Sequence, residues 1–282
     1  MNDRFGLGWR RELAAGVLAH IDRLDLVEVI ADDWLRASRH DLRALETLAA
    51  QLPVTLHGIG LGLASTLPVD VGRTEALGRL VGRVRPVHWS EHLAFVRAGG
   101  IEVGHLAAPP RNPATVAGAV RNLERIARRT GSCPLLENVA TLIEPPGSSM
   151  DEAAWITAVV EQSGALLLLD LHNLHANATN FGFDARAFLG RIPIERVRAV
   201  HLAGGRWIER FGRRRLLDDH HHDVPAAVHE LLIEVGQRAP QPLDVILERD
   251  GRYPPFADLL AELDLARVAL ARGRALRQEA VA

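Results

Sequence analysis

The chain has 282 residues, and its 33 basic side chains nearly balance 35 acidic ones, which gives a formal net charge of −2. A hydrophobic fraction of 48% with 24% charged residues is typical of a globular protein, and it excludes a disordered chain, a collagen-like fibre and a coiled-coil rod. The near-zero charge argues against nucleic-acid binding, which needs many phosphate contacts. No apolar run approaches the ~18 residues of a membrane span.

The N-terminal segment has no apolar stretch of signal-peptide length, so we expect no export. Cys133 is the only cysteine, which excludes an internal disulfide and favours a reducing, cytoplasmic location. All basic residues are arginine, and the absence of lysine excludes Schiff-base and lysine-base mechanisms. The 13 histidines are the feature of the composition that calls for a chemical explanation.

Short apolar runs alternate with longer stretches of helical periodicity along the whole chain. The predicted strands are Phe5–Gly8, Leu24–Ile30, Val54–Gly58, Val87–His92, Pro134–Asn138, Leu166–Leu171, Val197–Leu202 and Leu243–Glu248. The predicted helices span residues 10–20, 38–51, 70–83, 112–130, 151–163, 184–190, 224–237 and 255–273. No linker rich in Pro, Gly or Ser divides them, so we predict one domain over residues 1–282, with the last ten or so residues as a loose tail.

The strand runs are almost continuously apolar, as strands buried on both faces of a parallel sheet are. Eight alternations of strand and helix predict an α/β fold of the (β/α)8 TIM-barrel type. An open doubly wound sheet is the alternative, but no GxGxxG motif follows an early strand.

Seven of the eight runs end in side chains that are able to bind a metal. The C-terminal ends of barrel strands converge on one mouth, so these side chains are expected to meet in space. A bound cation is the simplest way to stabilise so many buried carboxylates and imidazoles, and their chemistry suits Zn, Mn or Fe. The residues are Glu28, His57, Glu91, His92, Glu137, Asn138, Asp170, His172, Asn173, His201, Glu248 and Asp250.

A second histidine-rich segment follows the seventh run, on an expected long loop. Asp218, His220 and His222 alternate there, so an extended backbone would point them the same way and let them close the site. Each histidine also has a simpler interpretation. A single strand-end histidine such as His57 is more often a hydrogen-bonded core residue than a ligand, and the three-histidine run is also compatible with a flexible loop.

Two further features have competing interpretations. Cys133 begins a predicted strand at the end of the barrel opposite the mouth, and we expect a small buried residue without a catalytic role. The stretch Arg206–Arg215 contains five arginines. It is either a solvated hairpin at the rim or a docking surface for an anionic substrate or partner.

The ordered set of motifs resembles the multinuclear non-haem iron-dependent oxidative enzymes, relatives of the methanobactin-biosynthesis oxidases that were long a domain family of unknown function. The motifs, in order, are LHG, SEHL, LLEN, LLLDxxN, NxGFD, HLAG, DxHxH and LERD, and the fifth is NFGFD at 180–184. The resemblance runs from about residue 6 to the last helix, and the ordered set is far more specific than any single motif.

The resemblance implies a xylose-isomerase-like TIM barrel that holds two or three mixed-valent iron ions and uses dioxygen as co-substrate. It implies a ribosomally synthesised precursor peptide (a RiPP precursor) as substrate, modified at cysteine, and a small leader-binding protein as a partner of many members. Carried over by position, His57, His92 and Glu137 hold one iron, and Glu137 bridges to a second iron held by Asp170, His201 and Glu248. Asp218, His220, His222 and Asn173 match further ligand positions, and Glu28 and Glu91 match groups beside the ligands or the substrate.

Two other functions stay open. A Zn- or Mn-dependent barrel of the endonuclease IV or xylose-isomerase type would use the same fold and similar ligands for hydrolysis or isomerisation. Dependence on oxygen separates that class from the oxidase. A non-catalytic barrel with a partner-binding rim is the third possibility, and it would keep partner binding after loss of metal.

Overall fold

The computed structural model describes residues 2–98, 101–210 and 212–281. Eight strands form a closed parallel barrel in the order β1-β12-β9-β8-β7-β4-β3-β2, which confirms the predicted (β/α)8 barrel. The chain divides into two compact units: a first unit of residues 1–25, 140–144 and 169–282, and a second unit of residues 26–139 and 145–168. The prediction of a single domain over residues 1–282 stays a prediction.

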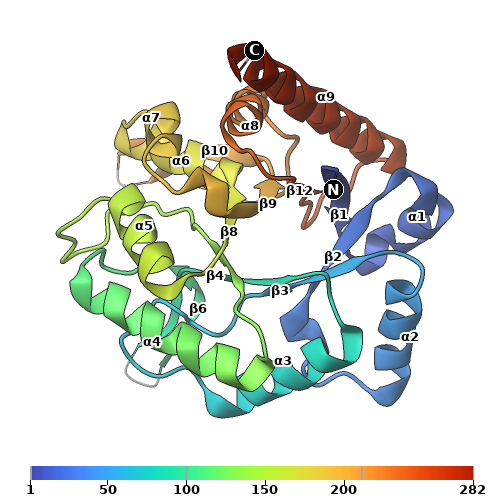
Figure 1. Cartoon of the computed structure of the whole chain (residues 1–282), viewed down its shortest axis with the longest axis horizontal. Coiled ribbons are helices and arrows are strands. Elements are labelled where there is room, and N and C mark those ends of the chain that lie inside the picture. Colours follow the sequence, from blue (N-terminus) through green and yellow to red (C-terminus); the bar gives the residue numbers. More distant parts are fainter. Residues whose placement is uncertain (1, 99–100, 211, 282) are drawn as a thin grey trace. The chain divides into compact units, whose positions relative to one another are not determined.

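The second unit carries four complete barrel strands with their outer helices (Figure 1). Parallel pairing places Ile30 beside His57, His57 beside Ser90, and His92 beside Glu137, so the polar ends of these strands lie in register. Its elements are β2 (Leu26–Ile30), a 3-10 turn (Ala31–Trp34), α2 (Arg39–Ala49), β3 (Val54–Gly58), α3 (Val71–Val84), β4 (Trp89–His92), β5 (Phe95–Ala98), β6 (Ile101–Ala107), α4 (Pro113–Thr130), β7 (Leu135–Glu137) and α5 (Glu152–Ser163).

The first unit carries strands and helices from both ends of the chain. Strand β12 pairs with β1 on one side and with β9 on the other. Its elements are β1 (Arg4–Gly8), 3-10 turns at Arg11–Leu13, Ile21–Arg23 and Ile194–Arg196, α1 (Ala14–Ala19), α6 (Leu171–Phe181), α7 (Ala185–Leu189), β9 (Val197–Leu202), β10 (Gly205–Arg210), β11 (Arg213–Asp218), α8 (Ala226–Arg238), β12 (Asp244–Leu247) and α9 (Phe256–Val281). Strand β8 (Leu167–Asp170) begins in the second unit and ends in the first.

Local sequence signals set the limits of the best-defined helix. Asn112 accepts backbone hydrogen bonds at the start of α4 and completes a capping box with Thr115, and Pro113 occupies the first helical position. Gly131 ends the helix with a φ of +81°, a left-handed conformation that favours glycine.

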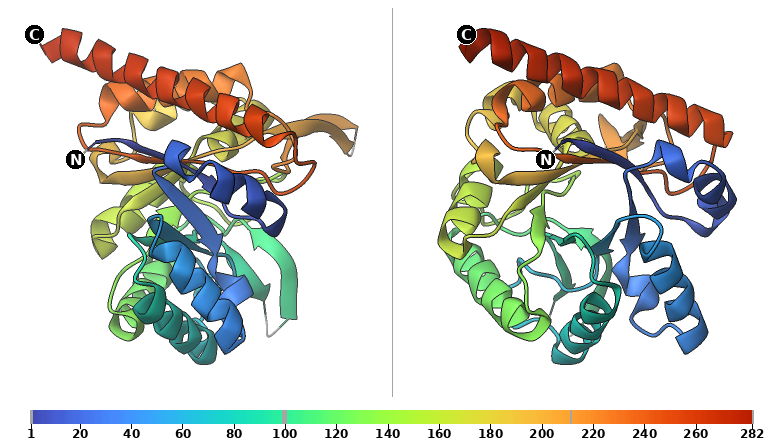
Figure 2. Two further views of the ribbon diagram at one scale, coloured as in Figure 1. Left: turned by 90° about the vertical axis from the view of Figure 1, so that its right-hand side faces the viewer. Right: turned by 45° about the vertical axis from the view of Figure 1, so that its right-hand side comes forward.

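Helices α8 and α9 lie lengthwise against each other in the first unit (Figures 1 and 2). A Cβ atom on Gly273 would lie 2.2 Å from the carbonyl oxygen of Ile233 and 2.9 Å from the Cα of Gly236. The two glycines therefore let the helix backbones meet directly, and any side chain at position 273 would force the helices apart.

Each of the eight predicted apolar runs overlaps a barrel strand, but several other elements differ from prediction. Helix α6 and the β5–β6 hairpin were not predicted, and the helix predicted to end at residue 273 continues to Val281. The predicted helix over residues 10–20 is a 3-10 turn followed by the short α1. Cys133 is exposed rather than buried, because it lies in the turn before β7 and not in the strand itself.

Candidate metal centre

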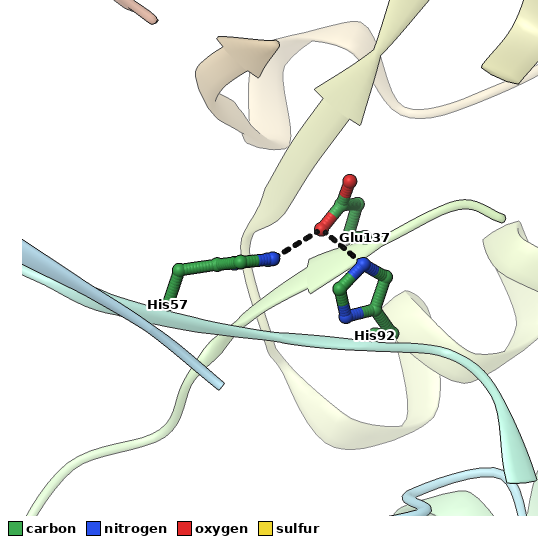
Figure 3. A group of neighbouring side chains, drawn as sticks. All are labelled: His57, His92 and Glu137. Atoms are coloured by element: carbon green, nitrogen blue, oxygen red, sulfur yellow. Dashed lines mark ion pairs between the residues drawn. The ribbon is translucent and has the colours of Figure 1, made fainter. Parts of the chain in front are cut away.

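The second unit brings one group of predicted ligands together at the C-terminal ends of its strands. His57 lies near the end of β3, His92 ends β4 and Glu137 ends β7, and all three side chains are buried. One ligand atom from each lies within 4.8 Å of the other two. The Nε2 atoms of His57 and His92 are 3.4 Å and 3.1 Å from the same carboxylate oxygen of Glu137 (Figure 3).

The other ring nitrogen of each histidine is hydrogen-bonded on the strands. His92 Nδ1 donates to the carbonyl oxygen of Gly58 at 3.1 Å, and a carbonyl is only an acceptor. His57 Nδ1 lies 2.7 Å from Ser90 Oγ, which itself donates to the carbonyl of Leu56 at 3.5 Å. Ser90 therefore accepts from His57, and both imidazoles carry their proton on Nδ1 when neutral.

This arrangement leaves each neutral ring with a lone pair on Nε2, directed at the carboxylate of Glu137. Three such donor atoms so close together repel one another unless a proton or a cation lies between them. Two imidazole nitrogens and a carboxylate oxygen, with no thiolate, suit a first-row divalent metal such as Fe, Mn or Zn. The residues present therefore fit the metal that the sequence predicts for this position.

The first unit holds a second group of buried side chains whose nitrogen and oxygen atoms could bind a metal; we call each such set a donor group. Asp170 ends β8, His201 lies in β9 and Glu248 directly follows β12, and one ligand atom from each lies within 4.8 Å of the others. His201 Nδ1 is 3.1 Å from Glu248 Oε2. Asp170 Oδ1 also accepts a hydrogen bond of 2.7 Å from the backbone N–H of Asn173, so it begins α6 as its N-cap. Asn173 itself is buried on the first turn of that helix.

The histidine-rich segment is connected to the second group through carboxylates. Asp218 ends β11 and accepts from His172 Nδ1 at 2.6 Å and from His220 Nε2 at 2.9 Å. His220 Nδ1 lies 3.1 Å from Asp250 and 3.5 Å from Glu248. Burial alone would lower the pKa of His220, but the charges of Asp218 and Glu248 outweigh it and raise that pKa well above its ordinary value.

The backbone of this segment is not extended, in contrast to the expectation from its alternating pattern. His220 has a φ of +54°, which turns the chain, and His222 Nδ1 lies 2.9 Å from Asp219. Asp218, His220 and His222 are absent from both converging donor groups found among the described residues. Their part in metal binding stays a prediction.

The two predicted neighbouring carboxylates lie elsewhere in the second unit. Glu28 is buried on β2 and accepts a hydrogen bond of 3.4 Å from Thr55. Glu91 accepts from the backbone N–H groups of Leu61 at 3.1 Å and of His92 at 3.0 Å. Burial, followed by the negative charge of Asp32, raises the pKa of Glu91 to about 8. Glu91 therefore holds the loop after β3 beside His57.

Sequence reasoning gave no site role to Ser90 and did not see that His172 holds Asp218. Ser90 lies opposite His57 in the register of β3 and β4, which no sequence pattern specifies. His172 is fully buried, and its ring occupies the space that a Cβ on Gly205 would need, 2.5 Å from His172 Cε1. Strand register in the second unit shows that Ser90 orients His57, and packing in the first unit shows that His172 orients Asp218.

The family described as "RiPP precursor modification enzyme MbnB/TglH/ChrH" matches residues 4–271. The chain belongs to this family. A UPF0276 protein of Bordetella bronchiseptica is 35% identical over 274 residues, covering 97% of this chain and 94% of the relative. A UPF0276 protein of Acaryochloris marina is 31% identical over 269 residues, covering 95% of each chain.

Solved structures show the same fold at low sequence identity. A D-psicose 3-epimerase of Clostridium cellulolyticum has a TM-score of 0.56 and 14% identity, covering 97% of this chain and 99% of the other. A xylose isomerase domain-containing protein of Salmonella typhimurium has a TM-score of 0.54 and 18% identity, covering 99% of both chains. The barrel is thus xylose-isomerase-like, as predicted, and the family match identifies the chain as a peptide-modifying enzyme of the RiPP class.

No helix in the described part of the chain combines the length and the apolar character needed to cross a membrane.

Proposed function

We propose that this protein is an iron- and dioxygen-dependent oxidase that modifies a RiPP precursor peptide at cysteine. The observation that carries the proposal is the pair of buried histidine–carboxylate groups at strand ends, in a chain that belongs to a peptide-modifying family. His57, His92 and Glu137 would hold one iron, and Asp170, His201 and Glu248 would hold a second. That Glu137 also serves the second iron is what the motif resemblance implies. The single cysteine is compatible with action in the reducing cytoplasm.

The residues around the proposed iron sites have different roles. Iron held by these residues would supply one-electron transfer between the peptide cysteine and dioxygen. His57 and His92 hold their Nε2 atoms toward Glu137 because Ser90 and Gly58 fix the protons on Nδ1. Glu91 fastens the loop after β3, while Asp218 and His220 form a charged chain that reaches Glu248. The peptide supplies the thiolate, since Cys133 lies outside both donor groups.

Metal content tests the proposal directly. Protein purified without oxygen should hold at least two magnetically coupled irons per chain, measured by elemental analysis and Mössbauer spectroscopy. Glu137→Ala should lose the coupled centre, whereas His92→Ala and His201→Ala should each lose one iron. His40→Ala is the matched control, because that side chain is 86% exposed on α2. Stoichiometric zinc, without activity after iron loading, would identify a hydrolase or isomerase instead.

Peptide chemistry is the second arm of the test. The wild-type protein, with any leader-binding partner it needs, should change the mass of a cysteine-containing precursor encoded near its gene only when oxygen is present. A precursor with serine in place of the cysteine should stay unchanged. Modification under strict exclusion of oxygen would contradict the oxidase proposal.

A further inference from the structure

The arginine-rich stretch forms an antiparallel hairpin of β10 and β11, and its two faces differ in charge. Phe211, between the two strands in the sequence, lies outside the described residues. The register places Arg210 opposite Arg213 and Ile208 opposite Arg215. Directly opposed residues of an antiparallel pair share a face, and so do residues two positions apart on one strand. Arg210, Arg213 and Arg215 therefore lie on one face of the hairpin.

The other face of the hairpin balances its charge internally. There, Arg214 lies opposite Glu209, and its guanidinium stacks over the ring of Trp207 at 4.2 Å. On the first face, Arg210 and Arg213 form no ion pair with any residue that the structure describes. Like charges directly opposite each other are destabilising in a sheet, so this face is charged beyond the needs of the fold.

One arginine of that face is held in place. Arg215 donates to the carbonyl oxygen of Asn180, and its guanidinium lies 5.6 Å from the centre of the Phe181 ring. The Asn180 side chain donates to the carbonyl of Leu216 at 2.9 Å and accepts from its N–H at 2.8 Å. The hairpin is therefore fastened to the end of α6, and its arginines project from a fixed support.

The three arginines line a cavity of about 690 Å³ within the first unit. Leu142, Ile143 and Phe181 form its apolar wall, and Glu144 is the one carboxylate among the described residues that line it. The volume falls in the range of small-molecule and peptide pockets and is far larger than one carboxylate or one phosphate requires. Its volume, its three arginines and its apolar wall fit a chain segment that carries several acidic groups beside an apolar side chain.

The cavity lies at a defined distance from the histidine-rich segment. The tip residue Arg213 and the base residue Asp218 are the two ends of β11, and five residue steps of a strand span roughly 17 Å. Asp218 in turn contacts His172 and His220. A peptide held at the tip would need about five extended residues to reach the base of the hairpin.

We propose that this cavity, the arginine pocket of Arg210, Arg213 and Arg215, docks an acidic segment of the precursor peptide. Guanidinium groups bind carboxylates in bidentate pairs, and Leu142, Ile143 and Phe181 receive an apolar side chain between them. The proposal rests on the proposed function in that it takes a precursor peptide as the ligand. The net charge of −2 and the small number of arginines in the pocket favour a peptide over a nucleic acid, which needs many phosphate contacts.

Fluorescence anisotropy with a labelled peptide tests the docking without any turnover. The probe is the peptide Glu-Leu-Glu-Glu-Leu-Glu, and its counterpart has glutamine in place of every glutamate. Wild-type protein should bind the acidic probe and not the glutamine probe. The double variant Arg210→Gln/Arg213→Gln should bind it at least about tenfold more weakly, because each charge-assisted pair contributes ~1.5–3 kcal/mol.

Arg214→Gln is the control, since it makes the same type of substitution and removes one positive charge from the opposite face of the same strand pair. The affinity for the acidic probe should change by less than about twofold, because an exposed charge outside the binding site contributes little. Equal weakening by Arg214→Gln, equal binding of the glutamine probe, or no binding by wild-type protein would overturn the proposal. Preference for a single-stranded oligonucleotide over the acidic probe would also overturn it.

Two outcomes separate this proposal from the oxidase proposal. Oxygen-dependent modification of the precursor with an unchanged KM in the double variant would remove the docking role and keep the oxidase. Charge-dependent probe binding by a protein that never modifies a precursor would keep the docking site and remove the oxidase. The iron content of the double variant should equal that of wild type in either case.

Discussion

The hydroxyl group of Ser90 should control the metal affinity of the site of His57, His92 and Glu137. Ser90 Oγ accepts the Nδ1 proton of His57 at 2.7 Å, and both side chains are almost fully buried. In Ser90→Ala that acceptor is lost, and the imidazole proton is free to move to Nε2, the atom that faces Glu137. Outer hydrogen bonds of this kind change metal affinity by ~10- to 100-fold, which corresponds to about 1.4–2.8 kcal/mol.

The assay is anaerobic competition for ferrous iron between the protein and a chelator of known affinity. Ser90→Ala should release iron at a roughly 10- to 100-fold lower chelator concentration than wild type. Ser132→Ala is the matched control, because Ser132 Oγ accepts from Trp89 Nε1 at 2.9 Å, outside the donor groups. Equal iron retention by Ser90→Ala and Ser132→Ala would refute the assignment of the His57 proton to Nδ1.

Three other substitutions test how the surrounding structure is held. The side-chain NH2 group of Asn122 donates hydrogen bonds to three carbonyl oxygens of the loop after β3. Asn122→Ala should therefore lower the unfolding free energy by about 3 kcal/mol, measured by urea titration. His172→Phe keeps an aromatic ring but removes a donor to Asp218, and amide exchange should accelerate in residues 218–223 while residues 71–84 stay unchanged. Arg249→Met leaves the half-buried carboxylate of Glu262 without its cation and with only the N–H of Val224 as a donor, so it should lower the melting temperature, whereas a double variant that adds Glu262→Gln should recover part of the loss.

The barrel was predictable because its strands carry a simple signal. Strands buried on both faces are apolar throughout, and Val197–Leu202 was predicted with the bounds that the structure shows. Helix α6 carries the opposite signal, since His172, Asn173, Asn177 and Asn180 are polar yet buried. Their side chains bond to neighbouring segments, such as Asn177 to the N–H of Thr141, and hydrophobic periodicity cannot reveal such a helix.

The candidate site divides in the same way. Residues at strand ends were predictable as donors, because the end of a parallel strand fixes where a side chain lies. The histidine-rich segment was harder, because the left-handed backbone of His220 breaks the alternation that its sequence suggests. Ser90 shows a third case, in which the decisive neighbour follows only from strand register. Sequence therefore locates donors on regular elements and leaves their orienting partners to the structure.

Substitutions in the buried donor groups and in the arginine pocket have different consequences for the fold. Buried donors such as His57 and His201 are fixed by strands, and a change there disturbs hydrogen bonds and packing together. Arg210 and Arg213 are exposed at a hairpin tip, where substitution leaves the core untouched. If the arginine pocket docks the precursor peptide as proposed, substitutions at the tip can change substrate choice while the metal-binding groups stay the same. Under this division, charge reversal at Arg210 and Arg213 should redirect the enzyme toward basic peptides and leave its metal content unchanged.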